Sequence, residues 1–190
     1  MNQDGLQTKR WRDELMTVIS SANVACGFHA GDPVTMRGAV VSAKRHGVAV
    51  GAHPGLPDLL GFGRRRMTVA PSDVADYVLY QVGAVAAFAR AAGVPLHHVK
   101  PHGALYMMAL EDGRVARAIV EAVGEFDDRL PIYTLADREL WHAANAPASG
   151  RWPSSSPTGR STGTARWSCS TGRTSSIRRR RRWRRAFGAC

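Results

Sequence analysis

Apolar and polar residues follow two different periods along the first 140 residues of the chain. Short apolar runs at residues 48–52, 96–99 and 130–135 predict buried strands. Between them, apolar residues recur at the spacing of a helix face, which predicts helices over residues 33–46, 71–92 and 113–123. Residues 13–20 fit a short helix and a strand equally well. Strands alternating with helices are typical of a parallel α/β fold.

Local capping residues predict where these helices begin and end. Asp32, followed by proline, is typical of an N-cap with proline at the first helical position, and Gly47 is a typical stop. Ser72 is the predicted N-cap of the longest helix, which Gly93 ends.

Three segments place histidine beside glycine or proline directly after an apolar run. They are residues 23–32 (Asn-Val-Ala-Cys-Gly-Phe-His-Ala-Gly-Asp), 51–65 and 99–106. Sites in parallel α/β folds gather at the carboxyl ends of the strands, so we expect these three loops to converge in space. This convergence is the main argument from the residues for an active site.

Lys100 and His102 are the leading candidate catalytic residues. Their Lys-Pro-His-Gly turn places a cation, which stabilises negative charge on an oxygen, beside an imidazole that transfers protons near neutral pH. His29 and Asp32 are further catalytic candidates. Asp32 fits the role of helix N-cap equally well.

Other polar groups of the three loops are candidate ligands for a substrate or a metal ion. Imidazole and carboxylate suit a divalent metal, for which His29 and His53 are the candidates, but hydrogen bonding to substrate explains the same groups equally well. Paired arginines suit a carboxylate or phosphate. The predicted substrate-binding residues are Asn23, His53, Asp58, Arg64, Arg65 and Tyr106.

Cys26 lies three residues from His29, a spacing that suggests a nucleophile, whereas a buried thiol acts as a small apolar group. We interpret four further histidines as structural or surface residues: His46, His97, His98 and His142.

The net charge of +11 is concentrated at one end of the chain. Eleven of the 26 Lys and Arg residues lie in residues 151–190, which hold no acidic residue, and the other 15 are matched by 15 Asp and Glu. This segment also lacks Val, Leu and Met, so it cannot bury enough apolar surface to fold. We predict an irregular N-terminus at 1–12, an α/β domain at 13–140 and a disordered basic tail at 141–190.

The basic tail has three interpretations. Its arginine cluster at residues 178–185, with Trp183, would contact phosphates and stack on the bases of a nucleic acid. A solvated tail would need no partner. The abrupt loss of acidic and branched aliphatic residues favours a third hypothesis, out-of-frame translation of a GC-rich gene.

Cysteine usage and the lack of long apolar runs bear on the cellular compartment. Cys26 is the only cysteine before residue 169, which implies no disulfide framework. No signal-like stretch follows Met1, and no run of about 18 apolar residues occurs. These features predict a cytoplasmic protein without a membrane partner.

The three segments together resemble the signatures of the LamB/YcsF family, the A subunits of 5-oxoprolinase. The similarity extends from Ser20 to Leu135 and rests on Ser-Ala-Asn-Val-Ala-Cys-Gly-Phe-His-Ala-Gly-Asp-Pro, Gly-Ala-His-Pro-Gly-Leu-Pro-Asp-Leu-Leu-Gly-Phe-Gly-Arg-Arg and Val-Lys-Pro-His-Gly-Ala-Leu-Tyr. The resemblance implies a TIM-like (β/α) barrel of the glycoside hydrolase/deacetylase type. It also implies ATP-dependent opening of the lactam 5-oxoproline to L-glutamate, with subunits B and C as partners and ATP acting through the complex.

Two functions remain as alternatives. A metal-dependent deacetylase or amidohydrolase would use the same fold neighbourhood and a divalent metal. A non-catalytic nucleic-acid binder would use the basic tail.

Two family features have no counterpart in this sequence. The acidic Asp-x-Asn-x-Asp-x-Gly-Glu-like segment does not occur in residues 1–12, and residues 151–190 stand where the late Phe-Ala-Asp-Arg-like segment is expected. We therefore expect a truncated copy with about half of the eight βα units of a barrel. Exposed strand edges would favour aggregation, and we expect no lactamase activity from the chain alone.

Overall fold

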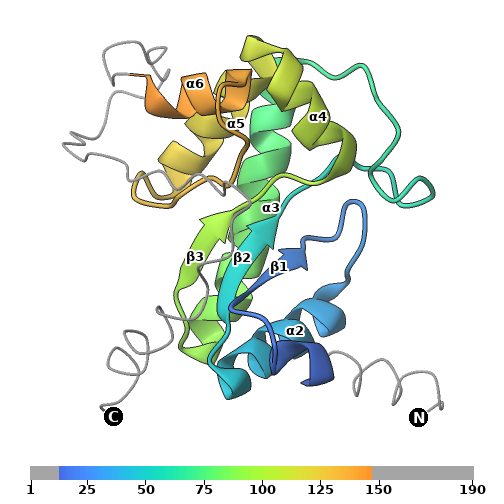
Figure 1. Ribbon diagram of the computed structural model, residues 1–190. Helices are drawn as coiled ribbons and strands as arrows, with labels where there is room; N and C mark the ends of the chain where they lie inside the picture. Colours follow the sequence, from blue (N-terminus) through green and yellow to red (C-terminus); the bar gives the residue numbers. More distant parts are fainter. Residues whose placement is uncertain (1–12, 147–190) are drawn as a thin grey trace.

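The computed structural model describes residues 13–146, which form a parallel α/β fold (Figure 1). The strands are β1 (Ser21–Ala25), β2 (Ala49–His53) and β3 (Leu96–Val99), and the helices are α2 (Pro33–His46), α3 (Pro71–Ala92), α4 (Gly103–Glu111), α5 (Gly113–Phe126) and α6 (Glu139–Asn145). A helical turn at residues 13–16 decides between the helix and the strand that both fitted this segment. Within residues 13–146, no helix is long and apolar enough to span a membrane.

The three strands form one open parallel sheet in the order β1-β2-β3. Beyond β3, the segment predicted as a strand at residues 130–135 contributes an isolated parallel bridge between Ile132 and Val99. Val99 donates to the carbonyl of Pro131 and accepts from the N–H of Tyr133. Pro131 has no N–H for a ladder, which helps to explain why a continuous strand does not form here.

The two faces of the sheet have different surroundings. Helices α2 and α3 pack against it, and Val24, Val50 and Ala52 belong to the buried core on that side. Figure 1 shows α3 running along the sheet and α4, α5 and α6 grouped beyond the carboxyl ends of the strands. Since successive strand residues point to opposite faces, Asn23 and Gly51 lie on the other side, which we call the open face.

Local chemistry at the ends of α2 and α3 follows the sequence prediction. The Asp32 side chain caps α2 by accepting from the N–H groups of Val34 and Thr35 at 2.8 and 2.9 Å. Gly47 and Gly93 end the two helices in the left-handed conformation, at φ values of 65° and 70°. These three predicted helix boundaries are confirmed.

The prediction of Ser72 as N-cap is wrong. Helix α3 begins at Pro71, and Ala70, two residues before Ser72, occupies the N-cap position without a side-chain bond. Proline supplies a helical φ and has no N–H that needs a cap, so the helix starts without help from Ser72.

Two helices have no counterpart in the prediction from sequence. Helix α4 follows the third histidine-bearing loop directly. Helix α6 extends five residues past the predicted domain end at 140, and its buried residues Leu140 and Ala144 lie on an element that packs against α5. A helix of seven residues contains about two turns, too few for a periodic pattern to be recognised.

The α/β class is confirmed, whereas the sheet described here is open and a TIM-like barrel is not confirmed. The disordered tail was predicted from residue 141, and this is wrong for residues 141–145, which are part of α6. The rest of that tail, from 147 onward, and the irregular segment predicted at 1–12 lie outside the described part of the chain.

Candidate active site

Three histidines meet at the carboxyl edge of the sheet. His29 lies on the loop after β1, His53 is the last residue of β2, and His102 follows β3. The rings of His29 and His102 stack with centroids 3.9 Å apart and an interplanar angle of 11°, and His53 meets His102 edge-on at 4.9 Å. The expected convergence of the three loops is therefore present, and we call these residues the histidine cluster.

Glycines of the second loop make room for the cluster. A Cβ atom at Gly55 would lie 2.6 Å from Nδ1 of His29, and one at Gly63 would lie 2.9 Å from Cδ2 of His102. Gly63 also has a φ of 66°, in the left-handed region that glycine adopts without strain. The close approach of this loop to two imidazole rings explains its glycine content.

A chain of hydrogen bonds runs through His53 and His102. Nδ1 of His53 donates to the carbonyl of Lys100, and Nε2 of His102 donates to the carbonyl of Phe62 at 2.7 Å. Between the rings, Nε2 of His53 and Nδ1 of His102 lie 3.1 Å apart. Carbonyl oxygens only accept, so both outer nitrogens carry protons, and the inner contact needs one more. The pair makes all of these bonds when it holds a charge of +1.

His29 and His53 are held in the neutral form. Only 2% of the surface of His29 is exposed, and its Nδ1 has no hydrogen-bond partner among the described residues. Burial, followed by repulsion from His102 and His53, lowers the pKa of His29 to about 4. Burial also lowers the pKa of His53 to about 4, against the opposing effect of its bond to the Lys100 carbonyl. Both rings are therefore neutral at pH 7.

Lys100 brings a positive charge to the same edge of the sheet. Its N–H donates to the carbonyl of Ala52 at 2.9 Å, so the strand pairing positions this residue. After the larger effect of burial, its charge contributes to lowering the pKa of His53 and of His98. A half-buried ammonium group beside neutral imidazoles suits the stabilisation of negative charge on an oxygen.

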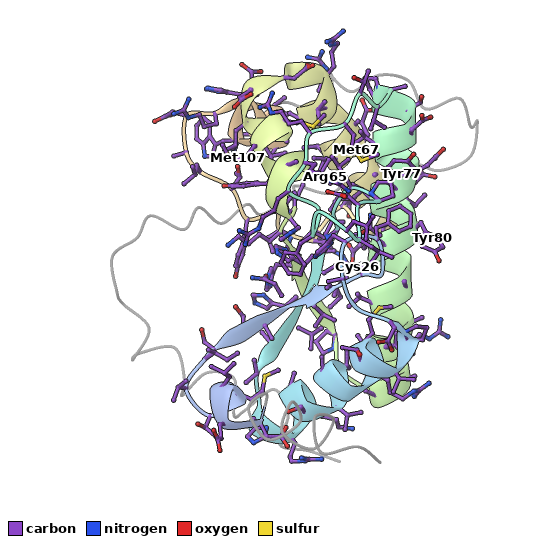
Figure 2. All side chains as sticks on the ribbon, turned by 90° about the vertical axis from the view of Figure 1, so that its right-hand side faces the viewer. Cys26, Arg65, Met67, Tyr77, Tyr80 and Met107 are labelled. Carbon is purple, nitrogen blue, oxygen red and sulfur yellow. The ribbon has the colours of Figure 1, made fainter. Side chains whose placement is uncertain are left out.

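Asp58 and Arg65, both predicted to bind substrate, bind each other. The buried Asp58 carboxylate accepts from the Arg65 guanidinium and from the N–H of Gly61 at 2.9 Å. The Arg65 hydrogen bond is the main reason why the pKa of Asp58 is lowered to about 2. Figure 2 shows Arg65 on the loop that crosses above the carboxyl end of β1, where Cys26 is labelled. The pair closes this loop, and the hydrogen-bonding capacity of the Asp58 carboxylate is used within it.

Three other predicted site residues, described next, make their contacts away from the histidine cluster. Besides capping α2, Asp32 accepts from the Thr35 hydroxyl at 2.6 Å, and these bonds lower its pKa. The Tyr106 hydroxyl accepts from the N–H of Leu135 at 3.0 Å. The exposed Arg64 guanidinium lies over the Phe62 ring, 5.6 Å from its centroid. None of these contacts involves the histidine cluster's rings.

Asn23, a predicted substrate-binding residue, contacts a histidine that was interpreted from the sequence as structural or surface. Its Oδ1 lies 2.7 Å from Nε2 of His98, which is fully buried. A side chain at Gly51 would overlap the His98 ring. A glycine inside a strand signals such a close approach, and Gly51 is therefore the feature of the sequence that points to His98.

Cys26 does not have the environment of a nucleophile. It is 1% exposed, and burial raises the pKa of its thiol to about 12. The thiol donates to the carbonyl of Val24 at 3.2 Å. The neighbouring Phe28 ring packs on Tyr77 and Tyr80 of α3, which Figure 2 shows on the same side of the molecule. Cys26 thus acts as a small buried group that helps to anchor the first loop.

The metal-ligand role predicted for His29 and His53 stays a prediction. In the part of the chain from 13 to 146, no three His, Cys, Asp or Glu side chains are grouped so that they could hold a metal ion. We derive no step through a metal.

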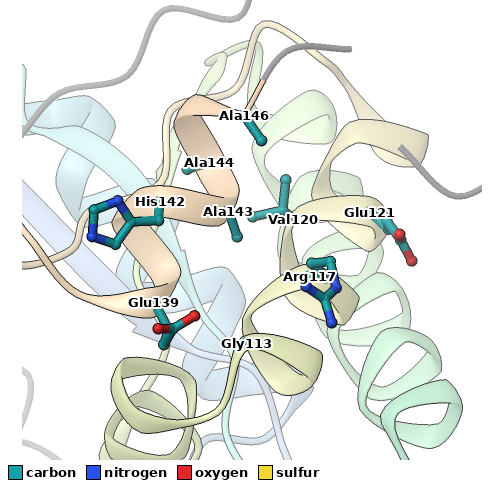
Figure 3. Close-up of a pocket in the computed structure, with 9 residues that line it drawn as sticks. All are labelled: Gly113, Arg117, Val120, Glu121, Glu139, His142, Ala143, Ala144 and Ala146. Carbon is teal, nitrogen blue, oxygen red and sulfur yellow. The ribbon is translucent and has the colours of Figure 1, made fainter. Parts of the chain in front are cut away.

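A separate cavity lies between α5 and α6 (Figure 3). Its volume is about 270 Å³, and it shares no residue with the histidine cluster. The cavity is lined by Gly113, Arg117, Val120, Glu121, Glu139, His142, Ala143, Ala144 and Ala146. The chemistry-bearing loops therefore form their site at the sheet edge and not in this cavity.

Comparison with known protein families shows to which family this chain belongs. The profile of the LamB/YcsF family matches residues 5–150, which is most of the chain. The chain belongs to the LamB/YcsF family. All three histidine-bearing loops lie within the matched residues.

Curated LamB/YcsF relatives carry a common name, that of the A subunit of 5-oxoprolinase. The relative from Geobacillus thermodenitrificans strain NG80-2 is 57% identical over 135 residues, which cover 71% of this chain and 53% of the relative. The protein of the same name from Tolumonas auensis is 58% identical over 130 residues, covering 68% and 52%. The chain spans about half the length of these relatives.

A solved LamB/YcsF-like structure has the same fold. The lactam utilization protein from Thermus thermophilus is 55% identical and superposes with a TM-score of 0.69. The superposition covers 70% of this chain and 54% of that structure. The α/β arrangement described here is therefore shared with an experimentally determined protein.

Proposed function

We propose that the chain contributes to the A subunit of an ATP-dependent 5-oxoprolinase, which opens the lactam of 5-oxoproline to L-glutamate. The observation that carries the proposal is the histidine cluster beside Lys100, in a chain that is 57% identical over 135 residues to a relative named as the A subunit of 5-oxoprolinase. That name implies further subunits, which we propose to be subunits B and C. We place the complex in the cytoplasm, in keeping with the single, unpaired Cys26 of the folded part.

Lactam opening makes three chemical demands. Water must add to the carbonyl carbon, the carbon–nitrogen bond must break, and the departing nitrogen must gain a proton. ATP, bound through the complex, would supply activation of the unreactive amide by phosphoryl transfer to its oxygen.

The residues of this chain have properties that suit the proton transfers of this reaction and the negative charge that develops on the oxygen. The neutral ring of His29 suits acceptance of a proton from water, and the contact between Nε2 of His53 and Nδ1 of His102 suits transfer of a proton toward the nitrogen. Lys100 suits stabilisation of charge on the oxygen.

We also infer that the described residues are part of a larger (β/α) barrel. The parallel sheet, its bridge from Val99 to Ile132 beyond β3, and the coverage of about half of the relatives support this view. In such barrels the site lies at the carboxyl ends of the strands, where the histidine cluster lies here.

Reconstitution tests the proposed function. The full chain is mixed with subunits B and C, and glutamate release from 5-oxoproline is measured with and without ATP. His102→Asn removes proton transfer and is expected to lower the rate about 100-fold or more. His142→Asn, in the separate cavity between α5 and α6, is the matched control and is expected to leave the rate unchanged.

Two outcomes of this assay would contradict the proposal. Glutamate release that does not depend on ATP would remove the proposed activation of the amide. A His102→Asn complex with full activity would remove the histidine cluster from the chemistry.

A further inference from the structure

A row of three residues crosses the open face of the sheet. Asn23 of β1 is paired with Gly51 of β2, and Gly51 is paired with His98 of β3. Paired residues of neighbouring strands point to the same face. Since Gly51 has no side chain, His98 reaches across the central strand and bonds to Asn23 on the far one.

Several contacts besides the bond to Asn23 hold the His98 ring in place. It is fully buried, and its ring stacks on Tyr133 with centroids 4.1 Å apart and an interplanar angle of 7°. Its Nδ1 lies 3.0 Å from Nδ1 of His97. The ring is therefore fixed by Tyr133 on one flat side, by the backbone at Gly51, and by polar contacts at both nitrogens.

The polar contacts define the protonation state of His98. The Oδ1 atom of Asn23 only accepts, so Nε2 of His98 carries the proton and donates across 2.7 Å. In the neutral ring, Nδ1 then accepts from His97. Burial is the main cause that lowers the pKa of His98 to about 3, with smaller electrostatic contributions from neighbouring basic side chains, and this keeps the ring neutral.

This arrangement also sets the direction of the Asn23 amide. A carboxamide is planar, so an oxygen held by His98 leaves the NH2 group pointing away from that ring. Asn23 is exposed on the open face. By strand alternation, His53 belongs to the same face, two residues beyond Gly51 on β2, which is about 7 Å. Lys100 follows the end of β3, two residues after His98.

We propose that His98 is a positioning residue that holds Asn23 so that its NH2 group donates to an oxygen of the substrate bound on the open face. The inference rests on the proposed function for the identity of that substrate. In 5-oxoproline the acceptors are the oxygens of the carboxylate and of the lactam carbonyl. Asn23 is thus the residue that contacts substrate, and His98 acts through it.

The protonation state of His98 gives a test that needs no substrate. In the full chain labelled with ¹⁵N, the imidazole nitrogen shifts of His98 at pH 7 are expected to report a neutral ring with the proton on Nε2. A neutral ring protonated on Nδ1 instead would have to accept at Nε2, which would place the Asn23 amide the other way round and overturn the proposal.

Substrate binding gives the second test. His98→Phe keeps a ring against Tyr133 and removes the donor, whereas His98→Gln restores an N–H at a similar reach. We expect His98→Phe to weaken the binding of 5-oxoproline to the full chain up to about tenfold, as the loss of one hydrogen bond would, and His98→Gln to recover part of it. Calorimetric titration measures the Kd, and thermal melts establish that each variant is folded.

A double variant separates positioning from a general structural effect. If His98 acts through Asn23, His98→Phe adds nothing to the loss caused by Asn23→Ala. Additive losses, or unchanged binding by His98→Phe, would overturn the proposal. If the wild-type chain does not bind 5-oxoproline, both the proposed function and the hydrogen bond from Asn23 to that lactam are wrong. The imidazole nitrogen shifts of His98 then still decide how the Asn23 amide is oriented.

Discussion

At the scale of single residues, burial decides which protonation states the site can use. His29 and His98 are almost completely enclosed, and burial is the main cause that lowers their pKa values to about 4 and about 3. An ordinary histidine titrates near 6.5. The fold therefore keeps both rings neutral where a solvated histidine would gain a proton.

The stability of the chain should consequently fall as the pH is lowered from 7 toward 4. In that window the unfolded chain binds protons at these positions and the folded chain does not, so unfolding is favoured by about 1.4 kcal/mol per pH unit for each fully titrating histidine. Urea denaturation at pH 7 and pH 5 measures the effect.

The variant His29→Phe should show a smaller loss of stability between these pH values, because it removes one of the two buried rings. Equal stability of the wild-type chain at both pH values would contradict the assignment of neutral, buried rings.

At the scale of elements, the start of α2 shows how one side chain can serve the fold next to a site. Asp32 accepts two backbone N–H bonds and one hydroxyl bond from residues of its own helix, and it is exposed. All of these contacts are those of a helix N-cap. A carboxylate there is also favoured by the helix dipole.

Substitution of Asp32 should therefore change stability and leave chemistry alone. Asp32→Ala is expected to lower the free energy of unfolding by about 1 kcal/mol, and Asp32→Ser, which can also cap, by less. Chemical denaturation gives both values, and the reconstituted assay gives the activity. A fully stable Asp32→Ser protein that has lost glutamate release would instead place Asp32 in the reaction.

At the scale of the whole molecule, the described residues leave apolar groups and strand edges uncovered. Leu60 is 95% exposed and Leu59 66% exposed on the loop between β2 and α3. Strand β1 lies at one end of the sheet's order. The relatives are about twice as long as the matched segment, so in them more chain is available to cover such surfaces.

We expect the chain on its own to self-associate. Size-exclusion chromatography with light scattering at increasing concentration should give a rising mass. Leu60→Glu should reduce the association, because it places a charge on the exposed loop. Val34→Glu, at an 82% exposed position on α2, is the matched control. A mass that stays monomeric at every concentration would contradict this expectation.

Features that depend on neighbouring residues could be predicted from the amino-acid sequence alone. Asp32, Gly47 and Gly93 predicted helix boundaries because caps are made by the backbone within one turn. The meeting of His29, His53 and His102 was also predictable, since parallel strands bring their carboxyl ends to one edge. Family membership was likewise readable from these loops.

Whether a polar side chain is free to bind a substrate, in contrast, depends on contacts that form only when the chain folds. Asp58 is held by Arg65 through closure of the loop between them, and no pattern of residue types fixes such a closure. His98 reaches Asn23 because the register of three strands aligns both with Gly51. Register and loop closure join residues far apart in the chain, whereas sequence patterns report on neighbours, and this is why these contacts emerged only from the fold.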